Sequence, residues 1–186
     1  KKLIEYIVNM KPDLCVEIGV FGGSSFIPQA LAIKQNGKGK IFGIDPWTNV
    51  AALEEMQEPK NIDWWGKLQI NEIYNHFLQN LDSFGVKDIS EIIRDKAENV
   101  CNNFADQSID FLHIDGNHSE NLAYKDAILY FPKVKMGGYI FFDDIYWCED
   151  GVNVSTRKAI NYLLQYCDKV EIIDNDCLIM QKVRSV

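Results

Sequence analysis

The chain has 186 residues, of which 47% are hydrophobic and 25% are charged, and its formal net charge is -8. The length favours a single domain of about 100–200 residues, and the composition excludes wholesale disorder, collagen and coiled coil. The acidic balance argues against nucleic acid and anionic membrane surfaces as partners, because their phosphates would repel the protein. No apolar stretch approaches the ~20 residues that a bilayer span needs, so we expect no membrane partner.

The cysteines are odd in number and scattered, and no two of them form a CxxC pair: Cys15, Cys101, Cys148, Cys167 and Cys177. This pattern argues against both a disulfide framework and a zinc site. We therefore expect reduced thiols in a cytoplasmic protein.

Short apolar runs alternate with longer amphipathic stretches along the chain. In chain order they predict a strand at Leu14–Gly19, a helix at Ser24–Gln35, a strand at Ile41–Asp45, a helix at Trp65–Leu81, strands at Ile89–Arg94 and Ile109–Asp115, a helix at Leu122–Phe131, a strand at Tyr139–Phe142 and a helix at Ser155–Tyr166. Two final runs, Val170–Ile173 and Leu178–Met180, flank a polar turn and predict a β-hairpin.

Strands that alternate with helices predict an α/β fold with a doubly wound, Rossmann-like sheet and helices on both faces. The sheet should be mostly parallel, with one antiparallel strand from the C-terminal β-hairpin. Residues 1–186 should form one domain. The segment 47–88 is long for a single crossover, so we expect it to form a helical lid or insert over one end of the sheet.

Ligands of open parallel sheets bind outside the carboxyl ends of the strands, and a glycine-rich turn follows the first predicted strand. Its sequence, Glu17-Ile18-Gly19-Val20-Phe21-Gly22-Gly23-Ser24-Ser25, would let a ligand approach the backbone closely. Phe21 stands where the G-x-G-x-x-G motif has its second glycine, and no P-loop lysine follows. A plain strand-to-helix turn remains an alternative.

Two further acids follow the second and third strands. Asp45 stands where an acid can accept both hydroxyls of a ribose, or it caps the next element. Asp95 can accept from an adenine amino group or cap the short helix that follows. Both alternatives stay open for each residue.

Three acids follow the fourth and fifth strands: Asp115, Asp143 and Asp144. Carboxylates gathered in a partly buried cleft repel one another, and a hard divalent cation such as Mg²⁺ relieves that repulsion. Partial protonation or helix capping is the alternative. His118 lies three residues past Asp115 and is a candidate general base, or a capping histidine; His113 is expected in the core.

Together these pieces resemble the class I S-adenosylmethionine-dependent methyltransferases, and most of all the small bacterial group that includes macrocin-type sugar O-methyltransferases. The pieces occur in the family's order: Val16–Ser25, Gly43–Trp47, Asp110–Ser119 and Pro132–Asp144. Each is weak alone, and together they are specific for the fold and the cofactor rather than for the substrate.

The resemblance implies a role for each matching residue. The methionine part of the cofactor would lie against Glu17, Gly19, Phe21, Gly22, Gly23 and Ser24, the ribose against Asp45, and the adenine near Asp95 and Ala97. Asp115 would border the cofactor and, with Asp143 and Asp144, match the metal ligands of the cation-dependent branch. The base of the related catechol-type enzymes matches His118. The second aspartate of the macrocin-type enzymes is Asn117 here, which cannot act as a base.

The function implied is O-methylation of a small hydroxylated acceptor, such as a sugar or secondary metabolite, with S-adenosylmethionine as cofactor and Mg²⁺ as an optional aid. Trp64, Trp65, Tyr146 and Trp147 either wall the acceptor pocket or serve packing. A non-catalytic cofactor-binding module is the main alternative, and the missing second glycine disfavours an NAD-dependent oxidoreductase. A homodimer is left open.

Overall fold

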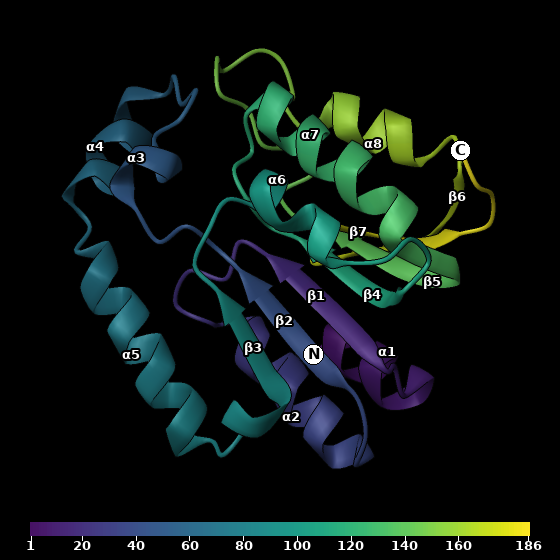
Figure 1. Cartoon of the computed structure of the whole chain (residues 1–186). Coiled ribbons are helices and arrows are strands. Elements are labelled where there is room, and N and C mark those ends of the chain that lie inside the picture. Colours follow the sequence, from purple (N-terminus) through teal and green to yellow (C-terminus); the bar gives the residue numbers. More distant parts are fainter.

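The computed structural model describes residues 1–186 and contains one seven-stranded sheet between helices (Figure 1). The strands are β1 (Leu14–Ile18), β2 (Lys40–Ile44), β3 (Ser90–Ile93), β4 (Ile109–Ile114), β5 (Val134–Phe142), β6 (Cys167–Ile173) and β7 (Cys177–Lys182). They lie in the order β3-β2-β1-β4-β5-β7-β6. β7 alone runs opposite to the other six strands, so it is antiparallel to both of its neighbours, β5 and β6. The predicted fold, a mostly parallel doubly wound sheet with one antiparallel strand from a C-terminal hairpin, is confirmed.

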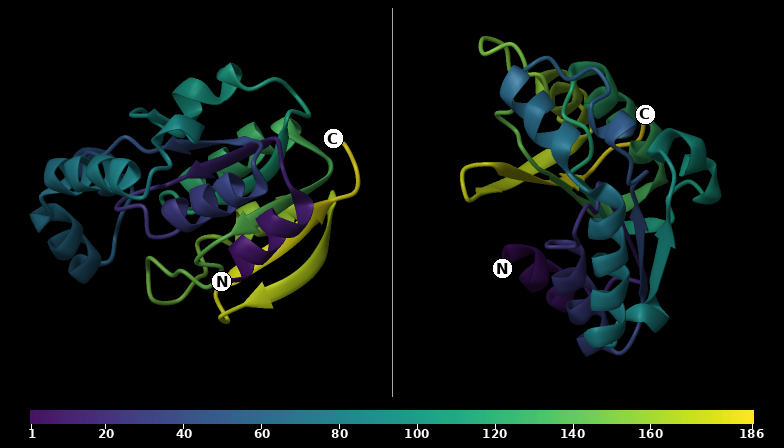
Figure 2. Two further views of the ribbon diagram at one scale, coloured as in Figure 1. Left: turned by 90° about the horizontal axis from the view of Figure 1, so that it is seen from below. Right: turned by 90° about the vertical axis from the view of Figure 1, so that its left-hand side faces the viewer.

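Helices cover both faces of the sheet, as predicted (Figures 1 and 2). One apolar cluster joins the sheet to α1 (Lys2–Met10), α2 (Phe26–Asn36) and α5 (Ile70–Ser83). The other joins it to α6 (Ala97–Val100), α7 (Glu120–Tyr130) and α8 (Arg157–Leu163).

The two clusters divide the sheet because strand side chains alternate between faces. Cys15 belongs to the first cluster, and its neighbour Val16 belongs to the second. Each fully buried aliphatic or aromatic side chain contributes roughly 1.5–3 kcal/mol. The sheet is therefore a rigid platform for the turns at its carboxyl edge.

The chain between β2 and β3 contains α3 (Asn49–Ala52), α4 (Pro59–Lys67) and α5, followed by the short η1 (Lys87–Ile89). Figure 1 shows α3 and α4 at the carboxyl ends of the strands. The single helix predicted over Trp65–Leu81 is wrong, because the chain is extended at Leu68 and breaks α4 from α5. The Asn49 amide donates to the carbonyls of Trp65 (2.8 Å) and Leu68 (3.0 Å), which satisfies the end of α4.

The remaining short helices, η2 (Cys101–Asn103) and η3 (Phe131–Lys133), lead into the strands that follow them. All five cysteines are free, and four of them are buried. None of the helices combines the length and the apolar character that crossing a bilayer would require. The single-domain organisation and the cytoplasmic location remain predictions.

Candidate active site

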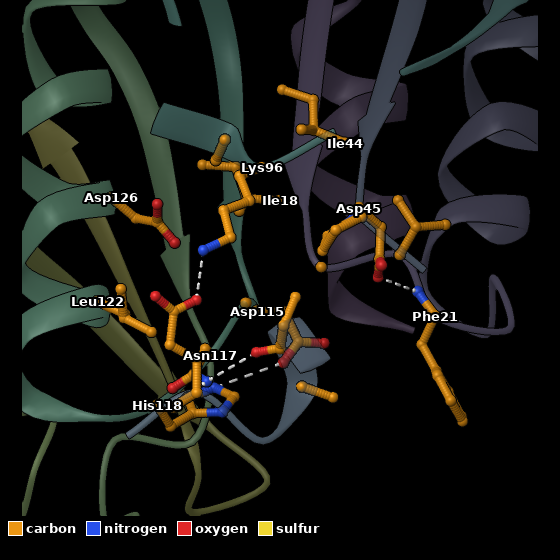
Figure 3. A pocket seen from close by; sticks show the side chains of 18 of the residues that line it. Ile18, Phe21, Ile44, Asp45, Lys96, Asp115, Asn117, His118, Leu122 and Asp126 are labelled. Carbon is orange, nitrogen blue, oxygen red and sulfur yellow. Dashed lines mark hydrogen bonds and ion pairs between the residues drawn. The ribbon is translucent and has the colours of Figure 1, made fainter. Parts of the chain in front are cut away.

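A cavity of about 340 Å³ lies at the carboxyl ends of the parallel strands (Figure 3). Its walls come from the turns after β1, β2, β4 and β5, from the insert, and from α6 and α7. Predicted site residues that line it are Gly19, Phe21, Ser24, Asp45, Ala97, Asp115, His118 and Asp144. Glu17, Gly22, Gly23, Asp95 and Asp143 are absent from its walls.

The glycine-rich turn after β1 is shaped by close packing. Gly19 has φ +85°, and a Cβ there would stand 1.9 Å from the carbonyl oxygen of Asp115. Gly23 has φ +81°, and a Cβ there would meet the ring of Phe77 at 2.5 Å. Only glycine tolerates both constraints. Gly23 thus seats the turn on α5, while Gly19 lets the turns after β1 and β4 touch.

Asp45 ties this turn to the end of β2. Its carboxylate accepts from the backbone N–H of Phe21 (2.9 Å) and of Trp47 (2.6 Å). The Trp47 indole donates back to the Phe21 carbonyl at 2.8 Å. Burial raises the pKa of Asp45, and the backbone hydrogen bonds work against that rise. Phe21 and Trp47 both hold positive φ values, of 48° and 45°, which marks stored backbone strain at this wall of the cavity.

Glu17 lies behind the cavity and is fully buried. Its carboxylate accepts from Ser25 Oγ (2.7 Å) and from the Gln29 amide, and it lies 3.4 Å from His113 Nδ1. The direct partners of Glu17 are therefore protein groups, which differs from the predicted contact with a cofactor. Glu17 holds the start of α2 from inside.

His113 continues this network to the end of β5. Its Nε2 lies 3.2 Å from Asp143 Oδ2. Although burial favours the neutral ring, the hydrogen bonds with Asp143 and Glu17 raise the pKa of His113 to about 10. The same bond lowers the pKa of Asp143 against the effect of burial. His113 is fully buried, as predicted for a core histidine, and its raised pKa favours the protonated ring between the two carboxylates.

The three acids of the predicted metal site fall into two groups that share Asp115. One group joins Asp115 with His113 and Asp143, and the other joins it with His118 and Asp144. Because His113 already compensates Asp143, the second group is the better candidate for a cation. Burial raises the pKa of Asp115 and of Asp144, and repulsion from neighbouring carboxylates adds to the rise, while His113 works against it at Asp115.

His118 is nearly buried, with 13% of its side chain exposed. Its Nε2 lies 3.4 Å from Asp144 Oδ2 and 3.7 Å from Asp115 Oδ1, and it has no hydrogen-bond partner. The ring packs against Trp147, with centroids 5.3 Å apart. Burial lowers the pKa of His118 to about 4. At neutral pH the imidazole is therefore uncharged, and the lone pair of its Nε2 has no partner.

Asp95 takes the capping alternative. Its Oδ1 accepts from the Lys96 N–H (2.7 Å) and from the Asn99 amide (2.7 Å) at the start of α6. The bond with Asn99 lowers the pKa of Asp95. Lys96 and Ala97, rather than Asp95, line the cavity at this end.

Of the four candidate aromatic residues, Trp64, Trp65 and Trp147 line the cavity, and Tyr146 does not. Phe21 and Trp65 form an edge-to-face pair with centroids 5.2 Å apart, and Trp64 packs against Trp65 at 4.9 Å. Trp64 is 52% exposed. These rings form an apolar rim on one side of the cavity.

Residues 48–67, called the lid below, are bound to the rest of the protein by Asn117 and Lys96. The Asn117 amide donates to the carbonyls of Glu54 (2.9 Å) and Ala51 (3.4 Å), while its Oδ1 accepts from the N–H of Ser119 (2.9 Å). Lys96 Nζ also pairs with the Glu54 carboxylate at 2.5 Å. Both polar atoms of the Asn117 side chain, Nδ2 and Oδ1, therefore have partners within the protein. This accounts for an amide at this position, because a carboxylate could not donate to the two carbonyls.

Three groups near the cavity were missed by sequence reasoning. Lys96 and Asp126 line it, and Asp176 from the β6–β7 turn lies beside Asp144, where the two carboxyl groups share a hydrogen bond. Asp126 lies on α7, and Asp176 lies in the turn between β6 and β7. Neither position carries a local sequence signal for a site.

A family described as a methyltransferase domain matches residues 16–145. The chain belongs to this family. The resemblance drawn from the motifs is confirmed at that level.

Among the relatives, an Arabidopsis thaliana protein named, by provisional assignment, as a caffeoyl-CoA O-methyltransferase is 27% identical over 89% of this chain. A Vitis vinifera protein named flavonoid 3',5'-methyltransferase is 28% identical over 76% of this chain. The chain spans 62% and 50% of the length of these two relatives.

Among solved structures, the O-methyltransferase TomG of Streptomyces achromogenes, involved in tomaymycin synthesis and solved in complex with SAM, superposes with a TM-score of 0.67. The match covers 99% of this chain and 78% of that one at 13% identity. At that identity the likeness concerns the fold.

Proposed function

We propose that the protein transfers a methyl group from S-adenosylmethionine to a hydroxyl oxygen of a small acceptor. One observation carries the proposal: a single cavity joins the Asp45 turn, where an acid can take a ribose, to the group of Asp115, His118 and Asp144. The family and the names of the two plant relatives support the same class of reaction.

The cavity has the chemistry that an adenosyl cofactor needs. Asp45 is an acid on its wall at the end of β2. Ile18, Ile44, Ala97 and Leu122 supply apolar surface suited to a flat base. Ser24 and Gly19 would border the methionine part. The bound cofactor supplies a methyl group already activated by its sulfonium charge.

His118 would act as the base. Its neutral ring and its unpartnered Nε2 beside the carboxyls fit acceptance of the proton that a hydroxyl loses as it attacks. The protein's other contribution is alignment, since a hydroxyl held in line with the methyl group reacts far faster than a free one.

A divalent cation fits the group of Asp115, His118 and Asp144, because two carboxyl groups crowd one spot and an imidazole nitrogen lacks a partner. A cation held there would occupy Nε2 of His118, so it would replace His118 as the group that activates the hydroxyl. When bound, a cation supplies a lower pKa for an acceptor hydroxyl. An imidazole ligand suits Mn²⁺ or another transition ion better than Mg²⁺, which prefers oxygen.

The acceptor would enter beneath the rim of Trp64, Trp65 and Phe21. An apolar aromatic rim favours an acceptor with a flat or apolar body that carries a hydroxyl group. A sugar or another secondary metabolite with an apolar face remains the finer hypothesis.

Isothermal titration calorimetry with S-adenosylmethionine and S-adenosylhomocysteine tests the cofactor, with NAD as the control ligand and with Mn²⁺ or Mg²⁺ present or absent. Micromolar binding of both sulfur ligands and no binding of NAD is expected. His118→Asn should then keep that binding and lose at least a hundredfold in methyl transfer once an acceptor is found. Failure of both sulfur ligands to bind would refute the proposal.

A further inference from the structure

The end of the cavity beside α6 and α7 forms a slot whose lining mixes apolar and charged side chains. Ile18 and Ile44 from the strands and Ala97 and Leu122 from the two helices supply its apolar surface. Gly116 contributes bare backbone to the same slot. A planar, weakly polar group fits such a slot better than a charged one.

Four charged side chains interrupt the apolar surface of this slot: Lys96, Glu98, Lys125 and Asp126. Asp126, on α7, points into the cavity from the side opposite Asp45 (Figure 3). A Cβ on Gly116 would lie 3.0 Å from Asp126 Oδ2, so the carboxyl group rests against the turn that follows β4. It is therefore placed at the edge of whatever fills the slot.

Asp126 has no partner within the chain, unlike the other charged groups beside it. Lys96 is paired with Glu54, and the neighbouring Lys125 is paired with Glu98. No hydrogen bond or ion pair reaches the Asp126 carboxyl group. Burial raises its pKa to about 7. The half-buried carboxyl group faces the cavity without a donor from the protein, so a ligand that fills the slot and brings a donor would be stabilised there.

We propose that Asp126 accepts a hydrogen bond from the exocyclic amino group of the cofactor's adenine and so selects adenine over bases that lack this donor. The assignment rests on the proposed function, because it presumes an adenosyl ligand in the cavity. It gives Asp126 the role that was left open for Asp95, whose carboxylate is used at the start of α6.

A double-mutant cycle between protein and ligand tests the contact. The ligands are S-adenosylhomocysteine and its analogue that carries unsubstituted purine, and calorimetry gives both affinities. Asp126→Leu should weaken S-adenosylhomocysteine about tenfold and leave the purine analogue within about twofold. Asp126→Asn, whose amide oxygen also accepts, should retain most of the preference for the adenine ligand.

Asp95→Asn is the matched control, because it removes an acid that lies next to Lys96 and Ala97 but does not line the cavity. It should leave the preference for the adenine ligand over the purine analogue unchanged. Equal weakening of both ligands by Asp126→Leu, or no weakening of either, would overturn the assignment while the proposed function stood. If Asp126→Leu does not fold, Asp126→Ala takes its place, and an unchanged preference for the adenine ligand in that variant would overturn the assignment. Wild-type protein that bound neither ligand would overturn the proposed function and this assignment together.

Discussion

Asn117 fastens the lid to the turn between β4 and α7, and Asn117→Asp removes that attachment with almost no change in volume. The wild-type amide donates to the carbonyls of Glu54 (2.9 Å) and Ala51 (3.4 Å). A carboxylate keeps the acceptor for the Ser119 N–H but turns an oxygen toward those two carbonyls. The lid should then open more often.

The magnitude follows from the contacts. One good and one long hydrogen bond are lost, at about 1 kcal/mol for the shorter bond and less for the longer one, and carbonyls are left facing a negative charge. A total of about 2 kcal/mol corresponds to roughly a 30-fold shift in the opening equilibrium. The lid is also held by Glu149, which accepts from the Gln57 N–H at 3.0 Å, and by the Lys96–Glu54 pair. Lys96→Met removes that pair, but both of its partners are more than a third exposed. Such a pair contributes about 0–1 kcal/mol, so Lys96→Met should shift opening less than about fivefold.

Amide hydrogen exchange measures this opening. The N–H groups of Ala52, Leu53 and Glu54 donate within α3 and its C-terminal turn, a helix of only four residues. So short a helix is not stable alone in water, so its protection reports docking of the lid. Exchange at these amides should accelerate strongly in Asn117→Asp and weakly in Lys96→Met. Rates in Asn117→Asp within twofold of wild type would refute the reasoning.

Three further predictions concern the turns, the slot and the rim. Gly19→Ala should destabilise the fold by several kcal/mol in a denaturant titration, because a Cβ there would lie 1.9 Å from a carbonyl oxygen. Gly37→Ala is the control: it has open space around a φ of +70° and should cost about 1 kcal/mol. Equal costs for the two variants would contradict the packing described. The folded protein holds a proton on Asp126 up to about pH 7, while the unfolded chain releases it near pH 4, so this group's stabilisation is lost as pH rises through that window. The Tm of Asp126→Asn relative to wild type should therefore increase from pH 4 to pH 7.5, and a constant difference would show that the group is solvated. Trp65→Ala should raise the KM for an acceptor and leave the Kd of S-adenosylhomocysteine within about threefold; a large loss of cofactor affinity would move the rim into the cofactor site.

The fold was predictable because its signals are local and repeated. Continuous apolar runs such as Leu14–Ile18 mark strands that are covered on both faces, and the alternation of elements leaves few topologies. The break at Leu68 in the helix predicted over Trp65–Leu81 was not predictable, because it depends on a contact between distant parts of the chain. Helical spacing continues through that residue, and the break comes from the Asn49 side chain, which satisfies the end of α4 from 16 and 19 residues away.

The candidate site was predictable only where position along a strand decides it. Asp45, Asp115 and Asp144 each follow a strand end, so the topology alone brings them to the cavity. Partners decide the rest. Glu17 and Asp143 also stand at strand ends, yet His113 between them draws both carboxylates inward. Nothing in the spacing of an isolated histidine reveals that it will be shared by two acids.

The turn from Asp115 to His118 joins the three parts of the cavity. Asp115 and His118 face the end where transfer would occur, Gly116 lies under Asp126, and Asn117 holds the lid. The carbonyl of Asp115 in turn touches the glycine turn at Gly19. A shift of this short segment therefore reaches the lid, the base slot and the acids at once. This is a reason for a rigid turn packed on backbone, rather than a flexible loop, at the centre of the site.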